Sequence, residues 1–455
     1  MVKHTRSRLG KNLKQLIVWR AIYLGGSFFA SPPPRPSADR RTDGVRLMKN
    51  IFYLAITMEF HRNVVEGIVR SLGEIFNEKK YADKVIERTF KKNPRWGSRD
   101  RRFIAETVYE IVRWWRLLQE VSGHRSLDER AMWNLVGAWL IIDKYNLPDW
   151  PEFKDIDQRK IEDKYEKAKG VRKIRESIPD WLDELGEKEL RNKWDKELHA
   201  LNQQAKVVLR TNTLKTSVGE LQKQLAEQSV ETSTLSNAPD ALVLNKRQNV
   251  FQLPQFKEGL FEIQDASSQQ VAYFMNVEPG MRVIDACAGA GGKTLHIATL
   301  MKNKGKVVAL DVDQWKLDEL KKRARRAGTF NVETKLIESG KTVKKLYESA
   351  DRLLLDVPCS GLGVLKRNPD AKWKLSPRFI EEVKVKQQEV LKNYGSILKP
   401  GGMMVYATCS LLASENEKQI EKFITEQKGF ELIEEKRIMP SEGFDGFYMA
   451  RLKKV

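Results

Sequence analysis

The sequence predicts a multi-domain protein with an all-α N-terminal domain, a small α+β module and a C-terminal α/β domain built on a doubly wound sheet. Three observations predict this architecture. The 455 residues are enough for two to four separate cores. Apolar residues recur at helical spacing up to about residue 195, and from about residue 265 short apolar runs alternate with amphipathic helical stretches. That alternation is typical of a mainly parallel sheet, whose ligands bind at the carboxyl ends of the strands.

The chain divides into four parts. Residues 1–57 form a disordered or mis-called extension, 58–195 the helical domain, 200–262 the α+β module and 263–455 the doubly wound domain. The extension carries eleven Lys and Arg against two acids, and its basic start before an apolar run is compatible with a secretory or organellar targeting segment. An over-long gene start, with Met58 as the working initiator, is the interpretation that we favour.

Composition narrows the function classes. A formal net charge of +20 indicates a polyanionic partner. No run of apolar residues is long enough to span a membrane, so no membrane partner is expected. Three cysteines, an odd number, argue against a disulfide framework and for a reducing, cytoplasmic location. Five scattered histidines and no C-x-x-C pair predict no metal site, and we expect a monomer.

The helical domain contains a basic stretch. Between residues 80 and 116 there are eleven Lys and Arg against five acids, interleaved with Trp96, Trp114 and Trp115. A solvated helix face and a surface that contacts nucleic-acid phosphates are equally compatible with this pattern.

A glycine-rich turn follows the first strand of the doubly wound domain, in the stretch DACAGAGGKT (285–294). A phosphate-binding Walker loop would need a glycine where Cys287 stands, and a dinucleotide fingerprint would need one at Thr294. A site for S-adenosylmethionine (SAM) fits better. Asp285 ends this strand and Asp311 ends the next, where a carboxylate can bind both ribose hydroxyls of a nucleoside.

Two thiols follow later strands. Cys359 comes after Asp356-Val357-Pro358, where amine methyltransferases carry an aromatic residue, and Cys409 follows the next sheet strand. Carbon-5 of a pyrimidine is a poor nucleophile, and a thiolate that adds to C6 activates it. Neighbouring fourth and fifth strands would bring both sulfurs to one pocket. A disulfide and two buried core cysteines remain alternatives. The E-N-V motif of the DNA enzymes is absent, and Glu415-Asn416-Glu417 is the nearest string, in the wrong context.

Residues 200–455 resemble the Sun-type (RsmB/Nop2-like) RNA cytosine-5 methyltransferases. The resemblance rests on motifs that occur in the right order, namely LRTNTL, GLFEIQDASSQ, DACAGAGGKT, DVPCSGLGVLKRNPDAKW, LKPGG, YATCSLLASENE and EGFDGFYMARL. It implies that Cys409 is the nucleophile, that Cys359 assists release of the methylated product, and that Asp356 contacts the target base and supports its protonation.

The resemblance also implies a SAM site. Its residues would be Cys287, Ala288, Gly289, Ala290, Gly291, Gly292, Lys293, Asp311, Ser339 and Asp356. Ser339 is a departure, because the family usually has an aspartate there to bind the adenine amine. A hydroxyl accepts a hydrogen bond more weakly than a carboxylate, so the expectation is reduced SAM affinity or substitution by Glu338.

The remaining parts fit the same family. Residues 58–195 resemble the NusB-like RNA-binding domain that precedes the methyltransferase in its RsmB branch, and 200–262 resemble its ferredoxin-like RNA-recognition segment. The resemblance therefore implies a SAM-dependent RNA cytosine-5 methyltransferase that acts on RNA, expected to be 16S rRNA, through a covalent bond between Cys and C6. The alternatives are the same chemistry on tRNA, and a catalytically idle RNA-binding factor for ribosome assembly.

Overall fold

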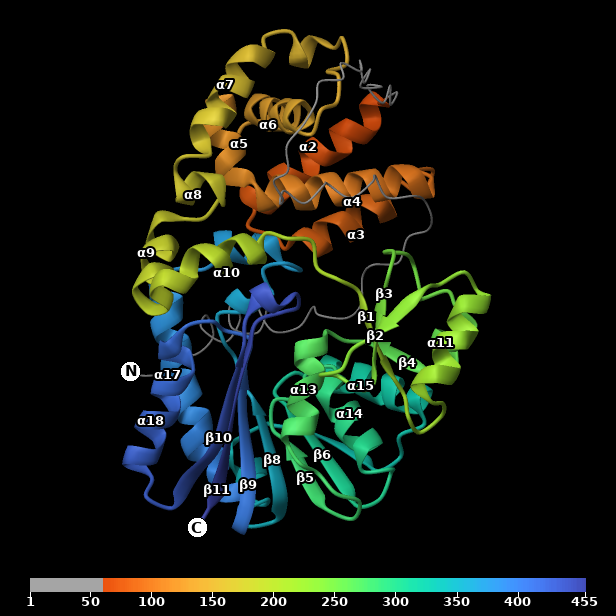
Figure 1. Ribbon diagram of the computed structural model, residues 1–455, viewed down its shortest axis with the longest axis vertical. Helices are drawn as coiled ribbons and strands as arrows, with labels where there is room; N and C mark the ends of the chain where they lie inside the picture. The colour runs from red at the N-terminus through yellow and green to blue at the C-terminus, as the bar shows by residue number, and fades with distance from the viewer. Residues whose placement is uncertain (1–59) are drawn as a thin grey trace, which may run out of the picture. The chain divides into compact units, whose positions relative to one another are not determined.

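The computed structural model describes residues 60–455 (Figure 1). Packing divides them into two compact units, one ending at Ile178 and one running from Pro179 to Val455. The predicted extension, residues 1–57, lies outside the described residues. Among the described helices, none combines the length and the apolar character needed to cross a membrane.

The N-terminal unit is helical, as its apolar periodicity predicts. Its elements are α2 (Arg62–Phe76), α3 (Ala82–Lys92), α4 (Ser98–Arg113), α5 (Trp115–Ser122), α6 (Glu129–Ile142), the 3-10 helix η1 (Pro151–Phe153), α7 (Gln158–Ala168) and α8 (Arg172–Arg175). The apolar stripe of α2 is buried and packs against α3, α4 and α6. The three-residue and four-residue spacing of that stripe therefore forms the centre of this unit.

Two of the tryptophans in the basic stretch belong to this core. Trp115 is 4% exposed and its ring stacks on Phe76 with 3.5 Å between the ring centroids. Trp96 lies against α2, where a Cβ added to Gly67 would come within 2.5 Å of the indole. The interleaving of aromatic and basic residues therefore reflects helix packing, and these two rings are not free to stack on bases.

The second unit begins with two helices that the sequence did not separate from the first. They are α9 (Asp180–Leu190) and α10 (Trp194–Leu201), joined by η2 (Arg191–Lys193). Trp194 is fully buried against Gly186, and its indole N–H donates to Asp183 at 2.8 Å. Glu197 accepts two hydrogen bonds from Ser441, far along the chain. The packing boundary thus falls after residue 178, before the predicted boundary at 195, because periodicity reveals a helix but not its partner.

The α+β module is a four-stranded antiparallel sheet of order β2-β3-β1-β4. Its elements are β1 (Val208–Thr211), α11 (Val218–Glu227), β2 (Thr232–Thr234), β3 (Ala241–Leu244), α12 (Pro254–Lys257) and β4 (Phe261–Ile263). The order strand, helix, two strands, helix, strand is that of a ferredoxin-like module, as the family resemblance implies. A core around Leu209, Leu221 and Phe261 holds the sheet on its helices.

The C-terminal domain is a seven-stranded sheet of order β10-β11-β9-β8-β5-β6-β7, in which β11 alone runs against the others. Its strands are β5 (Arg282–Asp285), β6 (Lys306–Asp311), β7 (Val332–Leu336), β8 (Ala350–Asp356), β9 (Leu398–Thr408), β10 (Phe430–Ile438) and β11 (Phe447–Lys454). Its helices are α13 (Ala266–Phe274), α14 (Gly292–Leu300), α15 (Gln314–Ala327), α16 (Gly340–Lys344), α17 (Pro377–Tyr394) and α18 (Glu417–Glu426). Short 3-10 helices complete it: η3 (Leu362–Val364), η4 (Pro369–Trp373), η5 (Gly395–Ile397), η6 (Ala413–Glu415) and η7 (Pro440–Glu442).

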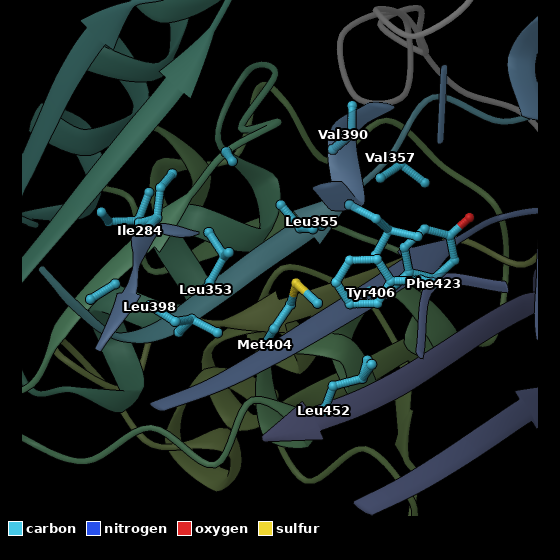
Figure 2. Packing of buried hydrophobic residues seen from close by; sticks show 14 of the residues in the cluster. Ile284, Leu353, Leu355, Val357, Val390, Leu398, Met404, Tyr406, Phe423 and Leu452 are labelled. Carbon is cyan, nitrogen blue, oxygen red and sulfur yellow. The ribbon is translucent and has the colours of Figure 1, made fainter. Parts of the chain in front are cut away.

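Helices cover both faces of this sheet. On one face Leu353, Leu355 and Tyr406 pack against side chains of α17 and α18, including Val390 and Phe423 (Figure 2). The alternate strand residues point the other way and pack against α13 and α14. Because side chains alternate along a strand, the central strands contribute to both cores, which is why these strands are nearly continuous apolar runs. The predicted doubly wound, mainly parallel sheet is confirmed.

Candidate active site

The glycine-rich turn links β5 to the start of α14. Gly289 and Gly291 have positive φ angles of 56° and 86°, a conformation that side chains with a Cβ rarely adopt. A Cβ on Gly291 would lie 2.5 Å from Leu320, whereas one on Gly289 would meet nothing within 4 Å. The turn is therefore packed on one side and open on the other, as a loop that approaches a ligand must be.

Two carboxylates flank the turn. Asp285 accepts a hydrogen bond from the hydroxyl of Thr294 at 2.7 Å, and burial raises the pKa of Asp285 to about 7 despite that bond. Asp311 accepts from the backbone N–H groups of Gly289, at 3.0 Å, and Asp313, at 2.9 Å. Asp311 thus faces the open turn from the neighbouring strand, where the ribose of a nucleoside would be bound.

The ferredoxin-like module supports this turn from behind. Arg210, on β1, is buried and donates to the carbonyl of Gly292 at 2.5 Å. Arg323, on α15, donates to the carbonyl of Ala290 at 2.8 Å and to Glu262 of β4 at 2.9 Å. Two guanidinium groups therefore fix the carbonyls of the turn. These contacts could not be predicted from the sequence, because the bonded residues are 82 and 33 positions apart in the chain.

The two thiols meet at the ends of β8 and β9. These strands are parallel neighbours, with Asp356 opposite Ala407, and each ends just before a cysteine. The sulfurs of Cys359 and Cys409 are 3.2 Å apart, and the backbone N–H of Cys409 donates to the sulfur of Cys359 at 3.3 Å. Neither cysteine forms a disulfide. The hydrogen bond between the two thiol side chains and burial raise the pKa of Cys359 well above its usual value.

Asp356 is paired with a cation from the glycine-rich turn. The ammonium of Lys293 lies 2.7 Å from its carboxylate and 5.3 Å from the centre of the Phe447 ring. The sequence placed Lys293 among the SAM-binding residues only, but its side chain reaches the candidate catalytic acid. Asp356 keeps 27% of its side chain exposed, so the acid stays accessible to a substrate.

The other predicted residues lie in the turn or follow β7. Cys287 is partly buried, and burial raises the pKa of its thiol well above the usual value. Ser339 is exposed and caps α16 by accepting from the N–H of Lys341 at 3.3 Å, and Glu338 is also exposed. Within residues 60–455 no group of three or more His, Cys, Asp or Glu side chains is arranged to hold a metal ion.

Known proteins with similar sequences share this layout. The sequence profile of the 16S rRNA methyltransferase RsmB/F family matches residues 272–453, and that of the ferredoxin-like domain of RsmF/B-like methyltransferases matches residues 178–251. A probable ribosomal RNA small subunit methyltransferase B from Synechocystis sp. is 34% identical over 439 residues, which cover 84% of this chain and 98% of that protein.

Two further proteins extend the comparison. The ribosomal RNA small subunit methyltransferase B of Pasteurella multocida is 37% identical over 297 residues, or 61% of this chain and 65% of that protein. The crystal structure of PH0851 superposes with a TM-score of 0.74 at 25% identity, covering 87% of this chain and all of that one.

The sheet, the open glycine-rich turn and these matches define the class of the chain as a SAM-dependent methyltransferase. The Synechocystis relative is matched along nearly its whole length, so the similarity is not confined to the cofactor domain. The chain belongs to the RsmB/F family of 16S rRNA methyltransferases. The Sun-type resemblance of its motifs is thereby confirmed.

Proposed function

We propose that this protein transfers a methyl group from SAM to carbon-5 of a cytosine in small-subunit ribosomal RNA. The observation that carries the proposal is the pair of thiols 3.2 Å apart and not joined in a disulfide, of which Cys359 follows the strand that ends in Asp356. A methyltransferase that acts on an exocyclic amine needs no thiol, because the lone pair of the amine attacks the methyl group itself. Attack by C5 needs a thiolate on C6.

The residues of the glycine-rich turn would hold the cofactor, with Asp311 on the ribose. The open side of Gly289 and the carboxylate that faces it fit a nucleoside without a pyrophosphate. When bound, SAM supplies an electrophilic methyl group on a sulfonium. Ser339 follows β7 and is exposed, so it is available to the adenine amine. We expect it to bind that amine less tightly than an aspartate would.

The thiols divide the reaction between them. The thiolate of Cys409 adds to C6 of the cytosine, and Asp356 supports protonation of the ring so that negative charge does not accumulate on it. Once C5 carries the methyl group, a base must take its proton. The electrons of that C–H bond then re-form the C5–C6 double bond, and Cys409 leaves C6 as a thiolate. Cys359 assists that release.

The helical unit and the ferredoxin-like module would each contact the RNA. Arg95 and Arg99 are exposed on the helical unit, where basic side chains can contact phosphates. The target cytosine has to be unstacked to reach the thiols, so a loop or an incompletely folded assembly intermediate suits the site better than a finished helix.

The test is product identification. Purified protein, SAM and unmodified small-subunit RNA should yield 5-methylcytidine on nucleoside digestion, and bisulfite mapping should locate it at a defined position that is lost when the gene is deleted. A methylated nucleoside other than 5-methylcytidine would overturn the chemistry. Methylation of tRNA instead would overturn the substrate, and the absence of any product with all RNAs would favour the idle assembly factor.

A further inference from the structure

A buried carboxylate lies directly behind the two thiols. Glu415 ends η6, has 0% exposed surface, and lies six residues beyond Cys409. Its carboxylate accepts three hydrogen bonds: from the backbone N–H of Ser360 at 2.7 Å, from the hydroxyl of Ser410 at 2.5 Å and from the amide of Gln387 at 3.1 Å. Glu415 is therefore bonded to both of the segments that carry a thiol.

The two segments that carry the thiols have the same Cys-Ser sequence, and both are bonded to this carboxylate. Each thiol is followed by a serine, Ser360 after Cys359 and Ser410 after Cys409, and the two hydroxyls are 3.0 Å apart. The sulfurs themselves are 3.2 Å apart. Two Cys-Ser pairs thus lie side by side on neighbouring strand ends, and both serines are bonded to one carboxylate.

Surrounding residues fix the carboxylate in turn. The amide of Gln387, on α17, also donates to the carbonyl of Pro358 at 2.9 Å. The hydroxyl of Tyr406 donates to the backbone carbonyl of Glu415 at 2.7 Å. Asn416, the next residue, accepts from the hydroxyl of Thr408 at 2.6 Å. The carboxylate is held by β9 on one side and by α17 on the other, so it is a rigid support.

An ionised group in this position is costly to bury. Burial raises the pKa of Glu415, and its hydrogen bonds only partly oppose that effect. A neutral or apolar side chain would avoid the desolvation cost and could fill the same space. A carboxylate differs from a neutral or apolar side chain because it accepts several hydrogen bonds at once from opposite sides. Here two of its donors, Ser360 and Ser410, belong to the two thiol segments.

Resting on the proposed function, we propose that Glu415 is a positioning residue that sets the separation of the two thiols, so that both reach the same cytosine. The nucleophile and the release group act on adjacent ring atoms, C6 and C5, so their sulfurs must stay within a few ångströms of each other. Loss of the bond to Ser360 or to Ser410 removes one of the hydrogen bonds that hold the two thiol segments at a fixed separation.

The experiment measures thiol separation without RNA. Phenylarsine oxide condenses with two neighbouring thiols, losing water and forming a ring, and its stable capture requires both sulfurs close together. The wild type should bind one equivalent, and Cys359→Ala should bind none stably. Glu415→Gln keeps the size but supplies donors where the carboxylate accepts. We expect it to bind the arsenical about tenfold more weakly, because the effective concentration of the second thiol falls.

Methyl transfer supplies the second readout. In Glu415→Gln the kcat should fall about 100-fold with an unchanged KM for SAM, as expected for reacting groups misplaced by about 1 Å. Glu417→Gln is the matched control. That glutamate pairs with Arg437 at 2.5 Å, keeps 27% of its side chain exposed and does not share the hydrogen bonds that Glu415 accepts from Ser360 and Ser410, so both readouts should match wild type.

Three results decide the matter. Wild-type arsenical binding by Glu415→Gln would overturn the positioning role, even if kcat fell. If that variant does not fold, Ser410→Ala removes one of the three bonds and should give an intermediate loss in both readouts, whereas wild-type values would overturn the role. The arsenical reaction needs no RNA. The thiol separation can therefore depend on Glu415 even if the protein does not methylate C5 of cytosine, and the two experiments test the inference and the proposed function separately.

Discussion

Substitution of Gly363 by alanine tests whether the segments that follow β8 and β9, each with one of the two thiols, must keep their positions relative to each other. Gly363 lies in η3, four residues beyond Cys359. Its N–H donates to the carbonyl of Cys409 at 2.8 Å, and its carbonyl accepts from the N–H of Gly446 at 2.8 Å. A Cβ at this position would lie 2.2 Å from the carbonyl oxygen of Gly446 and 2.8 Å from that of Cys409.

These distances set the size of the effect. Ordinary contacts of a Cβ begin at 3.4 Å, and the obstructing atoms are backbone, so no side chain can turn away. The segment after Cys359 must therefore shift by roughly 1 Å, which in an active site costs about 100-fold in rate. Overpacking of this kind also destabilises a fold by about 1–3 kcal/mol. We expect kcat to fall about 100-fold and the free energy of unfolding to fall by about 1–3 kcal/mol.

The assay is methyl transfer to small-subunit RNA under saturating SAM, with thermal unfolding measured in parallel. Gly219→Ala is the matched control. It lies within α11, where a Cβ would meet nothing within 4 Å, so it should raise stability by about 0.5–1 kcal/mol and leave kcat unchanged. A wild-type kcat in Gly363→Ala would refute the requirement for register between the two strand ends.

Three further substitutions address the cofactor loop and its acids. Lys293→Met removes the cation beside Asp356 and should lower kcat about 100-fold in a steady-state assay with the fold retained by circular dichroism; an unchanged kcat would show that the ion pair is structural. Arg210→Met removes a charged hydrogen bond to the glycine-rich turn and should weaken SAM binding about tenfold by calorimetry, and equal affinity would count against support of the turn by the ferredoxin-like module. Asp285→Asn tests the pH dependence of stability. The pKa of Asp285 is about 7 in the folded protein and 3.8 in the unfolded chain, so the free energy of unfolding of the wild type should fall as pH rises from about 4 to about 7. Denaturant titrations of the variant over the same pH range should lack that decline. Identical pH profiles for the two proteins would contradict the burial of an uncharged Asp285.

Much of the fold could be predicted from apolar patterning. Five of the seven strands of the large sheet, β5, β6, β8, β9 and β11, contain apolar runs, because both of their faces are buried there. The two edge strands differ: β7 has the sequence VETKL and is only partly buried, and β10 has the sequence FELIEEKRI and is exposed along most of its length. A charged edge strand such as β10 is recognised only by its partner, β11.

The candidate site was predictable where the chemistry is local. The glycine-rich turn, Asp311 and both thiols stand at strand ends that the sequence marks. The residues that hold the site in place could not be predicted from the sequence. Glu415 reads in the sequence as one acid in a polar string, and its contact with Ser360 spans 55 residues. Lys293 shows the same limit, because its partner Asp356 lies 63 residues away. Contacts of that range follow from the folded topology and not from spacing.

The assignment of roles to the two thiols is tested most directly by finding which sulfur carries the RNA. Cys359→Ala protein is incubated with SAM and small-subunit RNA, resolved on a denaturing gel, digested and sequenced by mass spectrometry. Removing the release group should leave a stable protein–RNA adduct, with the modified cytidine on the peptide that contains Cys409, and Cys409→Ala protein should form none. An adduct in Cys409→Ala, attached through Cys359, would contradict the account.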